Sequence, residues 1–381
     1  MTRSPDADAH LWPSPSQRLL LCAALGEPAA AVDAFANWRA SIDPNAAFGW
    51  DALCLLPLAY DNLRRLGVHD EPMERMKGVY RKTFVETNRL FHETRPVLEQ
   101  LANEGIELLL LKGAPLSFSY YGNLALRPMS DVDFVVRTTQ VADAVRVLEA
   151  HGWRGDYVAD DVSLRFRHAI RFTRDDGREL DLHWRVLIES RDDASTDFFW
   201  QHTVPCSFLG IHARQLDPTA LIVHTVLHGV RWNTVTPVRW IPDALLVLRT
   251  RGSEVDWNAV LAFATRRKVT FRLGLGLSFL AKEFDAPIPA DVIRAVTQRG
   301  PTVAERLENM TLLVDPVRFL GPVGNTLWIA LDYSRGPGYG GVIAYLAEFP
   351  NYLAFRWYLS NRREVLPYVF RRLVRRLTRR A

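Results

Sequence analysis

The stretch LKGAPLSFSYYGNLALRPMSDVDFVV, from Leu111 to Val136, places two acidic residues at the start of an apolar run. Another short apolar run, IELLLL, leads into it, and Gly122 lies between the two runs. Short apolar runs separated by a glycine are typical of buried strands, so the pattern predicts a strand, a short helix and a second strand. Because side chains alternate along a strand, Asp131 and Asp133 would point to the same side, with their backbones about 7 Å apart.

A second alternating stretch predicts a hairpin. The sequence RFRHAIRFTRDDGRELDLHWRVL alternates on both sides of the turn Asp175-Asp176-Gly177, which is typical of two antiparallel strands. In the second arm the apolar side chains share one face and must pack on the core, which places Asp181 on the opposite face. If this strand lies beside the one that bears Asp133, the two carboxylates reach the same site.

Helical patterns flank these strand segments. From Gln17 to about Gln100, and again beyond about Glu189, apolar residues recur at three- and four-residue spacing, which indicates helices. We therefore predict an α+β protein in which a small mixed-sheet core is flanked by N-terminal helices and a C-terminal helical region. We expect four regions: an N-terminal helical region (1–80), the core (81–190), a helical domain (191–340) and an aromatic and basic C-terminal tail (341–381).

Composition excludes several classes of protein. With 48% hydrophobic and 24% charged residues, the 381-residue chain can bury a sizeable core. Its three widely spaced cysteines form no CxxC or CxxH pattern, which argues against a disulfide framework or a zinc ribbon. The first residues lack the apolar segment of a signal peptide, and no later run reaches the roughly 18 apolar residues of a membrane span. We therefore expect a cytoplasmic protein.

The two neighbouring aspartates point to metal chemistry. Two ionised carboxylates repel each other unless they share divalent cations, and Mg²⁺ takes carboxylates, waters and substrate phosphates as ligands. A third carboxylate on a neighbouring strand would complete the site, and either Asp181 or Glu179 can supply it from the same face. Phosphoryl transfer uses this arrangement because the metals clamp the attacking and leaving oxygens. The alternative is that Asp131 and Asp133 form a solvated strand end.

The same residues resemble a known family. The segments LKG, YY, RPMSDVD and LDLHW follow one another as they do in a bacterial, uncharacterised branch of the nucleotidyltransferase superfamily to which polymerase β belongs. The resemblance implies that Gly113 forms the turn that holds the triphosphate, that Asp131 and Asp133 bind the metals and that Asp181 is the third acid. Ala114 departs from the pattern, because the superfamily usually has serine or a second glycine there.

The resemblance, which covers roughly residues 85 to 250, implies an enzyme. It would transfer a nucleoside monophosphate from an NTP to an acceptor hydroxyl, releasing pyrophosphate, with Mg²⁺ or Mn²⁺ as the metal. The resemblance hints at tailoring of a small molecule or a modified peptide in biosynthesis. The alternative is a non-catalytic module of regulatory or toxin–antitoxin type that binds a nucleotide or a partner on the same fold. The three acids favour the enzyme, because a site that has lost its catalytic activity is not expected to retain all three.

Three further residues in this half of the chain are candidates for the site. Lys112 precedes the glycine turn, and Arg127 lies four residues before Asp131. Either cation would contact the phosphates of the nucleotide or, alternatively, form a local salt bridge. His183 shares the face of Asp181, where it would orient that carboxylate, touch the substrate or bond to the backbone.

The second half of the chain offers a pair of histidines. His224 and His228 lie one turn apart on a predicted helix. This spacing can bind zinc, but the glutamate of zinc proteases is absent and no third ligand is visible. Together with Asp243, the histidines match residues of the resembling family and are expected to line the cleft, the alternative being packing and helix capping.

The C-terminal tail NRREVLPYVFRRLVRRLTRRA predicts a basic amphipathic helix. Arginine pairs recur every four residues from Arg371, and the opposite stripe carries Leu366, Phe370, Leu373 and Leu377. Such a helix can dock on an anionic membrane surface, an RNA or an acidic partner. The alternative is a helix that packs its leucine stripe on the protein body.

Overall fold

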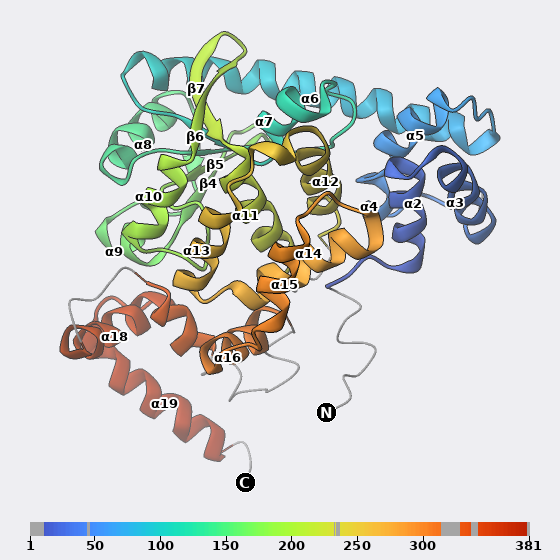
Figure 1. Ribbon diagram of the computed structural model, residues 1–381. Helices are drawn as coiled ribbons and strands as arrows, with labels where there is room; N and C mark the ends of the chain where they lie inside the picture. Colours follow the sequence, from blue (N-terminus) through green and yellow to red (C-terminus); the bar gives the residue numbers. More distant parts are fainter. Residues whose placement is uncertain are drawn as a thin grey trace.

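A seven-stranded mixed sheet lies at the centre of the computed structural model, with the strand order β3-β4-β5-β2-β1-β7-β6. The structure describes residues 11–43, 46–231, 233, 237–313, 328–336 and 342–378. Helices precede the sheet, cover it and follow it along the chain (Figure 1). The predicted fold class, a mixed-sheet core flanked by helices on both sides in sequence, is confirmed. The division into four regions stays a prediction.

The elements follow one another in three groups. The first group consists of the helices α2 (Pro15–Leu25), α3 (Pro28–Ser41), α4 (Trp50–Leu53), α5 (Leu56–Arg65) and α6 (Glu71–Asn103). The sheet region contains β1 (Leu109–Leu111), α7 (Gly113–Leu116), η1 (Ser117–Tyr121), β2 (Asp131–Val135), η2 (Thr138–Gln140), α8 (Val141–Ala150), β3 (Arg154–Gly155), α9 (Asp161–Phe166), β4 (Ala169–Thr173), β5 (Glu179–His183), α10 (Asp193–Gln201), β6 (Thr203–Phe208) and β7 (Ile211–Leu216). The last group contains α11 (Pro218–Gly229), α12 (Trp240–Arg251), η3 (Gly252–Glu254), α13 (Trp257–Arg267), α14 (Thr270–Phe284), α15 (Ala290–Gln298), α16 (Val303–Leu312), α18 (Val342–Arg356), η4 (Arg362–Glu364) and α19 (Val365–Thr378). Residues 328–334 are also helical.

The strands that carry the acidic residues are neighbours in the sheet. Strand β2 pairs antiparallel with β1 and parallel with β5, and the second register sets Asp133 opposite Asp181. The predicted hairpin is confirmed as the antiparallel pair β4–β5, with Gly177 in a left-handed conformation (φ 79°) in its turn. The second strand of that hairpin therefore lies beside the strand that bears the two aspartates.

One prediction of secondary structure is wrong. Helices were expected beyond Glu189, but residues 203–216 form the hairpin β6–β7, which extends the sheet beside β1. The turn of this hairpin uses Leu209 (φ 55°) and Gly210 (φ 86°) in left-handed conformations. The turn thus has Leu-Gly in place of the Asn-Gly or Asp-Gly pair that marks tight hairpins in a sequence. Pro205 in β6 further weakens the strand pattern.

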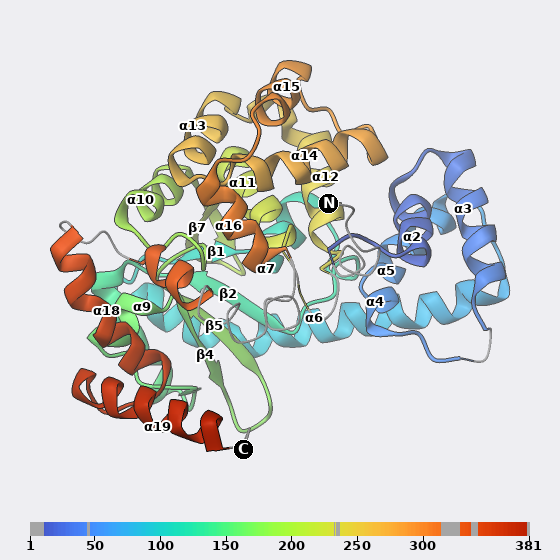
Figure 2. The same ribbon diagram turned by 90° about the horizontal axis from the view of Figure 1, so that it is seen from below.

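Alternation along the strands gives the sheet two different faces. Val132, Phe134 and Leu182 belong to one apolar cluster with buried residues of α6 and α8. Leu111 and Val135, on the other face, belong to a second apolar cluster with residues of α11, α12 and α14. The long helix α6 and the helix α11 accordingly lie on opposite sides of the sheet (Figures 1 and 2). The acidic residues share the face toward α11, so the helical region after the sheet covers the site.

The C-terminal segments attach to the edge of the core. Phe166 of α9 packs with Tyr333 and Tyr352 in a third apolar cluster. Beside it, the buried Arg191 donates a hydrogen bond of 2.9 Å to Asp332. Across the described residues, no helix is both long and apolar enough to cross a bilayer.

Candidate active site

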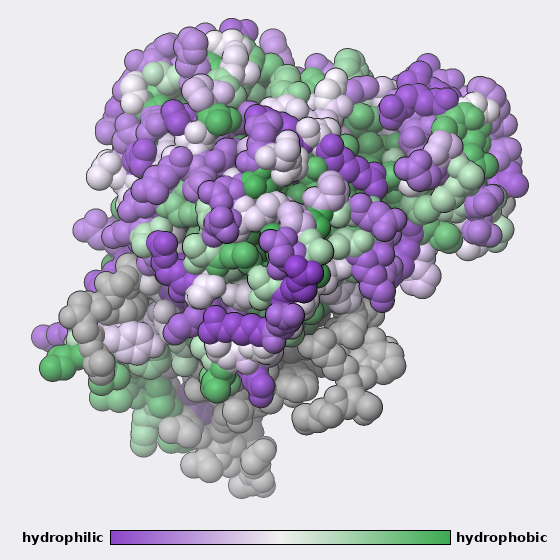
Figure 3. Space-filling model, in the orientation of Figure 1, coloured by the Kyte–Doolittle hydropathy of each residue, from purple (hydrophilic) through white to green (hydrophobic). Residues whose placement is uncertain are grey.

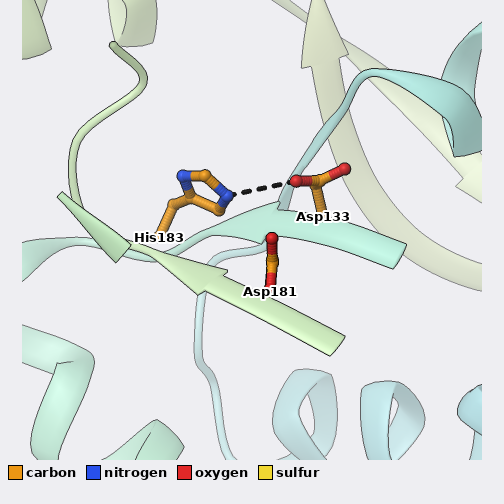
Figure 4. A group of neighbouring side chains, drawn as sticks. All are labelled: Asp133, Asp181 and His183. Atoms are coloured by element: carbon orange, nitrogen blue, oxygen red, sulfur yellow. Dashed lines mark hydrogen bonds and ion pairs between the residues drawn. The ribbon is translucent and has the colours of Figure 1, made fainter. Parts of the chain in front are cut away.

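Three side chains from two neighbouring strands meet on the face of the sheet that α11 covers. Asp133 comes from β2, and Asp181 and His183 come from β5; we call these three residues the donor group (Figure 4). One oxygen or nitrogen atom from each lies within 4.8 Å of the others. Asp133 and His183 are buried, and Asp181 is half-buried. Two carboxylates and an imidazole at these separations match the ligands that divalent cations accept.

The register of the strands explains why these residues meet. Asp133 lies directly across from Asp181, and His183 lies across from Val135. Neighbouring strands are just under about 5 Å apart, so side chains that face each other across a pair come into contact. The Nε2 atom of His183 lies 3.2 Å from Oδ1 of Asp133. The predicted parity of the strand is confirmed, because the apolar Leu182 faces the opposite cluster.

Lys112 is the cation closest to the donor group. Its ammonium group forms an ion pair and a hydrogen bond with Oδ1 of Asp133. Burial alone would raise the pKa of Asp133, but Lys112 and His183 favour the charged carboxylate and hold its pKa well below the ordinary range. Asp133 is therefore an ionised carboxylate although it is buried.

Asp131 lies at the start of β2, opposite Glu179 and outside the donor group. Burial and the nearby charge of Asp133 raise the pKa of Asp131 to about 6. Burial and Asp133 also raise the pKa of Asp181. The ionised Asp133 thus disfavours the charge of Asp131 and Asp181 on this face, which is the electrostatic condition that a bound cation relieves.

The backbone next to the site is strained at Lys112, which has φ 50° and ψ −119°. Gly113 does not carry the left-handed conformation of this turn, although the resemblance assigned the turn to it. A Cβ atom at Gly113 would lie 2.5 Å from Nη1 of Arg127. Glycine is therefore required here because the guanidinium of Arg127 lies against the backbone.

Arg127 forms a buried, two-pronged ion pair with Asp243 of α12. Its Nε and Nη2 atoms donate hydrogen bonds of 2.8 and 2.9 Å to the two carboxylate oxygens. The hydroxyl of Tyr121 donates a third bond of 2.8 Å to the same carboxylate. This contact joins the segment between β1 and β2 to the helical region, and Nη1 of Arg127 remains directed at Gly113.

A cavity of about 210 Å³ adjoins the donor group on the side of α11 and α12. Lys112, Arg127, Arg231 and Arg239 contribute cations to its wall. Within the described part of the lining, the carboxylate is that of Asp243, which Arg127 neutralises. We call this space the basic cavity, and its charge suits an anionic ligand.

The two histidines of α11 also line the basic cavity. Their rings stack with centroids 5.6 Å apart. Burial and the nearby Lys112 lower the pKa of His224 to about 3, and burial and Arg231 hold the pKa of His228 well below its ordinary value. Both rings are therefore neutral at physiological pH, and the buried Nε2 of His224 has no hydrogen-bond partner among the described residues.

The structure thus gathers most of the predicted candidates around one site. Two residues of the cavity wall, Arg231 and Arg239, were not predicted. Arg231 follows His228 by three residues, just beyond the end of α11, so its closeness in sequence to the histidines could have identified it. Arg239 had no such signal, because its guanidinium reaches the carbonyl of Pro128, which is 111 residues away in sequence.

The donor set fits a divalent metal ion. Carboxylate oxygens suit Mg²⁺ and Mn²⁺, and a neutral imidazole nitrogen adds a ligand that Mn²⁺ accepts more readily than Mg²⁺ does. His183 can offer its Nε2 to such an ion, because this atom lies 3.2 Å from Oδ1 of Asp133. The group Asp133, Asp181 and His183 can therefore hold a metal beside a cavity that suits phosphates.

Two solved structures show a distant likeness to this chain. The solution structure of the antibiotic-resistance factor ANT(2'')-Ia shares 15% sequence identity, with 48% of this chain and 94% of that chain covered and a TM-score of 0.34. The crystal structure of an antigenic nucleotidyltransferase-like protein from Paracoccidioides brasiliensis shares 13% identity, with 56% and 99% covered and a TM-score of 0.33. Scores at this level are too low to bear on fold or activity.

The family comparison is stronger. Among curated proteins, no relative matches the sequence. The sequence model of a family described as uncharacterised nucleotidyltransferases, however, matches residues 51–285, which is more than half of the chain. The matched range spans the sheet, the donor group and both helices that line the basic cavity. The resemblance found in the sequence is thereby confirmed, and the protein belongs to this uncharacterised nucleotidyltransferase family.

Proposed function

We propose that this protein transfers a nucleoside monophosphate from an NTP to the hydroxyl group of an acceptor. The observation that carries the proposal is the donor group, in which Asp133 and Asp181 face each other across parallel strands with His183 beside them. Nucleotidyl transfer needs such a group because charge develops on the oxygens of the reacting phosphate. Membership of a nucleotidyltransferase family supports the same reaction class.

The bond changes follow from this reaction class. The acceptor oxygen bonds to the α-phosphorus while the bond from that phosphorus to the bridging oxygen of the β-phosphate breaks, and pyrophosphate leaves. We assign the hydroxyl proton to Asp181, because burial and Asp133 raise its pKa and make its carboxylate a better base. Asp131 and Asp133 would hold two Mg²⁺ ions, which stabilise the charge on the attacking and leaving oxygens when bound, with Asp181 as the third acid beside them.

The basic cavity is our candidate site for the phosphates of the NTP. Lys112 lies between this cavity and Asp133, so its ammonium can bind a phosphate once a metal neutralises that aspartate. Arg231 and Arg239 add positive charge to the same wall. For Arg127 we propose a smaller direct contribution, through Nη1 over Gly113, because its other two donors already bind Asp243. The neutral His224 and His228 would contact the nucleotide or the acceptor by hydrogen bonds rather than by charge.

We propose four further properties of the protein from its sequence patterns. These are the choice of Mg²⁺ as the ion, a small molecule or a modified peptide as the acceptor, a role in biosynthetic tailoring and a cytoplasmic location. The acceptor must present its hydroxyl near Asp181, whose half-buried carboxylate lies at the accessible side of the donor group.

Two measurements test the proposal together. Thermal shift with each of the four NTPs, in Mg²⁺ or Mn²⁺, identifies the nucleotide, and incubation with that nucleotide labelled at the α-phosphate identifies transfer from labelled product and released pyrophosphate. We expect metal-dependent stabilisation that Asp133→Asn abolishes, followed by transfer to an acceptor in a metabolite extract. Stabilisation without transfer would favour the non-catalytic alternative, and stabilisation that survives Asp133→Asn would contradict the site assignment.

A further inference from the structure

The C-terminal helix α19 is held to the protein by one side only. At its start Val365 is buried, with 6% exposure, and one turn on, the ring of Tyr368 packs against Trp357 with centroids 5.0 Å apart. Trp357 directly follows the end of α18. In Figures 1 and 2, α19 lies at the outer edge of the molecule and extends away from the sheet.

The apolar stripe of α19 faces the solvent instead of the body. Leu366 is 79% exposed and Phe370 is 68% exposed. At about 100° per residue these two side chains lie on one stripe, roughly opposite the side that carries Val365 and Tyr368. The alternative in which the leucine stripe packs on the body is therefore wrong for these two residues. The side chains of Leu373 and Leu377, which continue the stripe in sequence, lie outside the described residues.

Positive charge lies on the part of α19 that faces away from the exposed stripe. Arg371 and Arg372 are exposed, each about 130° around the helix from the stripe, and Arg362 and Arg363 are exposed in η4 just before it. The sequence of α19 contains no acidic residue, and none of the described carboxylates forms an ion pair with Arg371 or Arg372. Further arginines follow at positions 375, 376, 379 and 380, with side chains outside the described residues. The helix thus exposes an apolar stripe and, on the part away from it, a pair of arginines.

The neighbouring helix α18 also exposes large apolar side chains. Ile343 and Leu346 of α18, three residues apart, are 86% and 63% exposed. Figure 3 shows hydrophobic surface in the region of this helix, at the lower left of the molecule. Clustered apolar exposure of this kind is unusual for a protein surface that contacts only water.

We propose that α19 docks the protein on the surface of an anionic lipid bilayer. The arginines would contact lipid phosphates, and Leu366 and Phe370 would enter the boundary between head groups and acyl chains, with the helix parallel to the surface. An RNA would satisfy the arginines but would leave the aliphatic stripe in water, so the exposed stripe favours lipid. The proposal concerns an interaction surface and is independent of the nucleotidyl-transfer reaction.

The test is co-sedimentation of the full-length protein with vesicles of phosphatidylcholine, with and without phosphatidylglycerol. We expect saturable binding to the anionic vesicles that weakens as salt increases. Leu366→Ser with Phe370→Ser should weaken binding about tenfold or more, because two apolar side chains no longer leave water. Arg371→Gln with Arg372→Gln should weaken it about tenfold on anionic vesicles only.

A matched control removes the same charge elsewhere. Arg294→Gln with Arg299→Gln replaces two exposed arginines at α15 and should leave binding unchanged. All variants replace exposed side chains, and circular dichroism melting checks that each is folded. The proposal is overturned if the intact protein does not bind anionic vesicles, if the Leu366 and Phe370 variant binds as well as the wild type, or if the arginine pair supports binding to single-stranded RNA alone.

Discussion

Replacing Asp131 with asparagine should stabilise the metal-free protein at neutral pH. Burial and the charge of Asp133 raise the pKa of Asp131 from its ordinary value of 3.8 to about 6. Between these two pH values, Asp131 is therefore protonated in the folded protein, whereas in the unfolded chain it has already lost its proton. Ionising Asp131 in the folded protein therefore costs free energy. The asparagine side chain has nearly the same shape and no charge, so it removes this cost and keeps the packing.

The sign and size of the effect follow from linkage. Below about pH 4, Asp131 is protonated in both states and contributes nothing. As the pH rises from about 4 to about 6, the free energy of unfolding decreases, because only the unfolded chain releases the proton freely. Above pH 6 the full cost is at most about 3 kcal/mol, from about 1.4 kcal/mol for a change of one in pKa. Since Asp131 is half-buried, we expect a gain of about 1–2 kcal/mol from the substitution.

The assay is thermal melting of wild type and Asp131→Asn in chelator at pH 4 and pH 7.5. The variant should melt higher at pH 7.5 by a few degrees and equally at pH 4. Glu179→Gln is the matched control. It removes a carboxylate from the same face of the sheet, but this carboxylate is ion-paired with Arg171. Addition of Mn²⁺ at pH 7.5 should reverse the order, since the ion neutralises the acids of the wild type. Equal stability of wild type and Asp131→Asn at both pH values would refute the electrostatic picture of the site.

Two further predictions separate chemistry from structural support. Arg127→Met should lower the free energy of unfolding by about 3–5 kcal/mol in urea titrations, because Asp243 is left buried without its cation. Adding Asp243→Leu should recover much of that loss. An Arg127→Met protein of normal stability would contradict this prediction. Asp181→Asn should lower kcat about 100-fold or more with little effect on NTP affinity, whereas Glu179→Gln should leave kcat nearly unchanged; the reverse outcome would assign the base to Glu179.

The sequence was most informative in the strands, where the two-residue alternation of side chains determines which face each residue occupies. Leu180 and Leu182 had to be buried, and this alone placed Asp181 on the polar face, as the structure confirms. Whether the two acidic strands lie side by side was left open by the apolar runs, and the structure pairs them. The hairpin β6–β7 escaped prediction because its turn has Leu209 before Gly210, where tight hairpin turns usually have Asn, Asp or Gly.

Contacts between distant parts of the chain could not be read from local patterns. Arg127 and Asp243 were both identified as candidates, but their ion pair joins positions 116 residues apart. The contact of His183 with Asp133 depends on strand order, which alternation does not determine. For α19 the sequence showed an apolar stripe, whereas only the packing of Val365 and Tyr368 determines that the stripe faces outward.

The most direct test of the central claim is a titration of Mn²⁺ into the metal-free protein with NTP present, followed by the electron paramagnetic resonance signal of free Mn²⁺. If Asp133 belongs to the metal-binding group, the wild type should remove Mn²⁺ from solution beyond the amount that NTP binds by itself. Asp133→Asn should lose this additional binding, and Asp175→Asn, in the exposed hairpin turn, should retain it. An Asp133→Asn protein that binds Mn²⁺ as the wild type does would contradict the account.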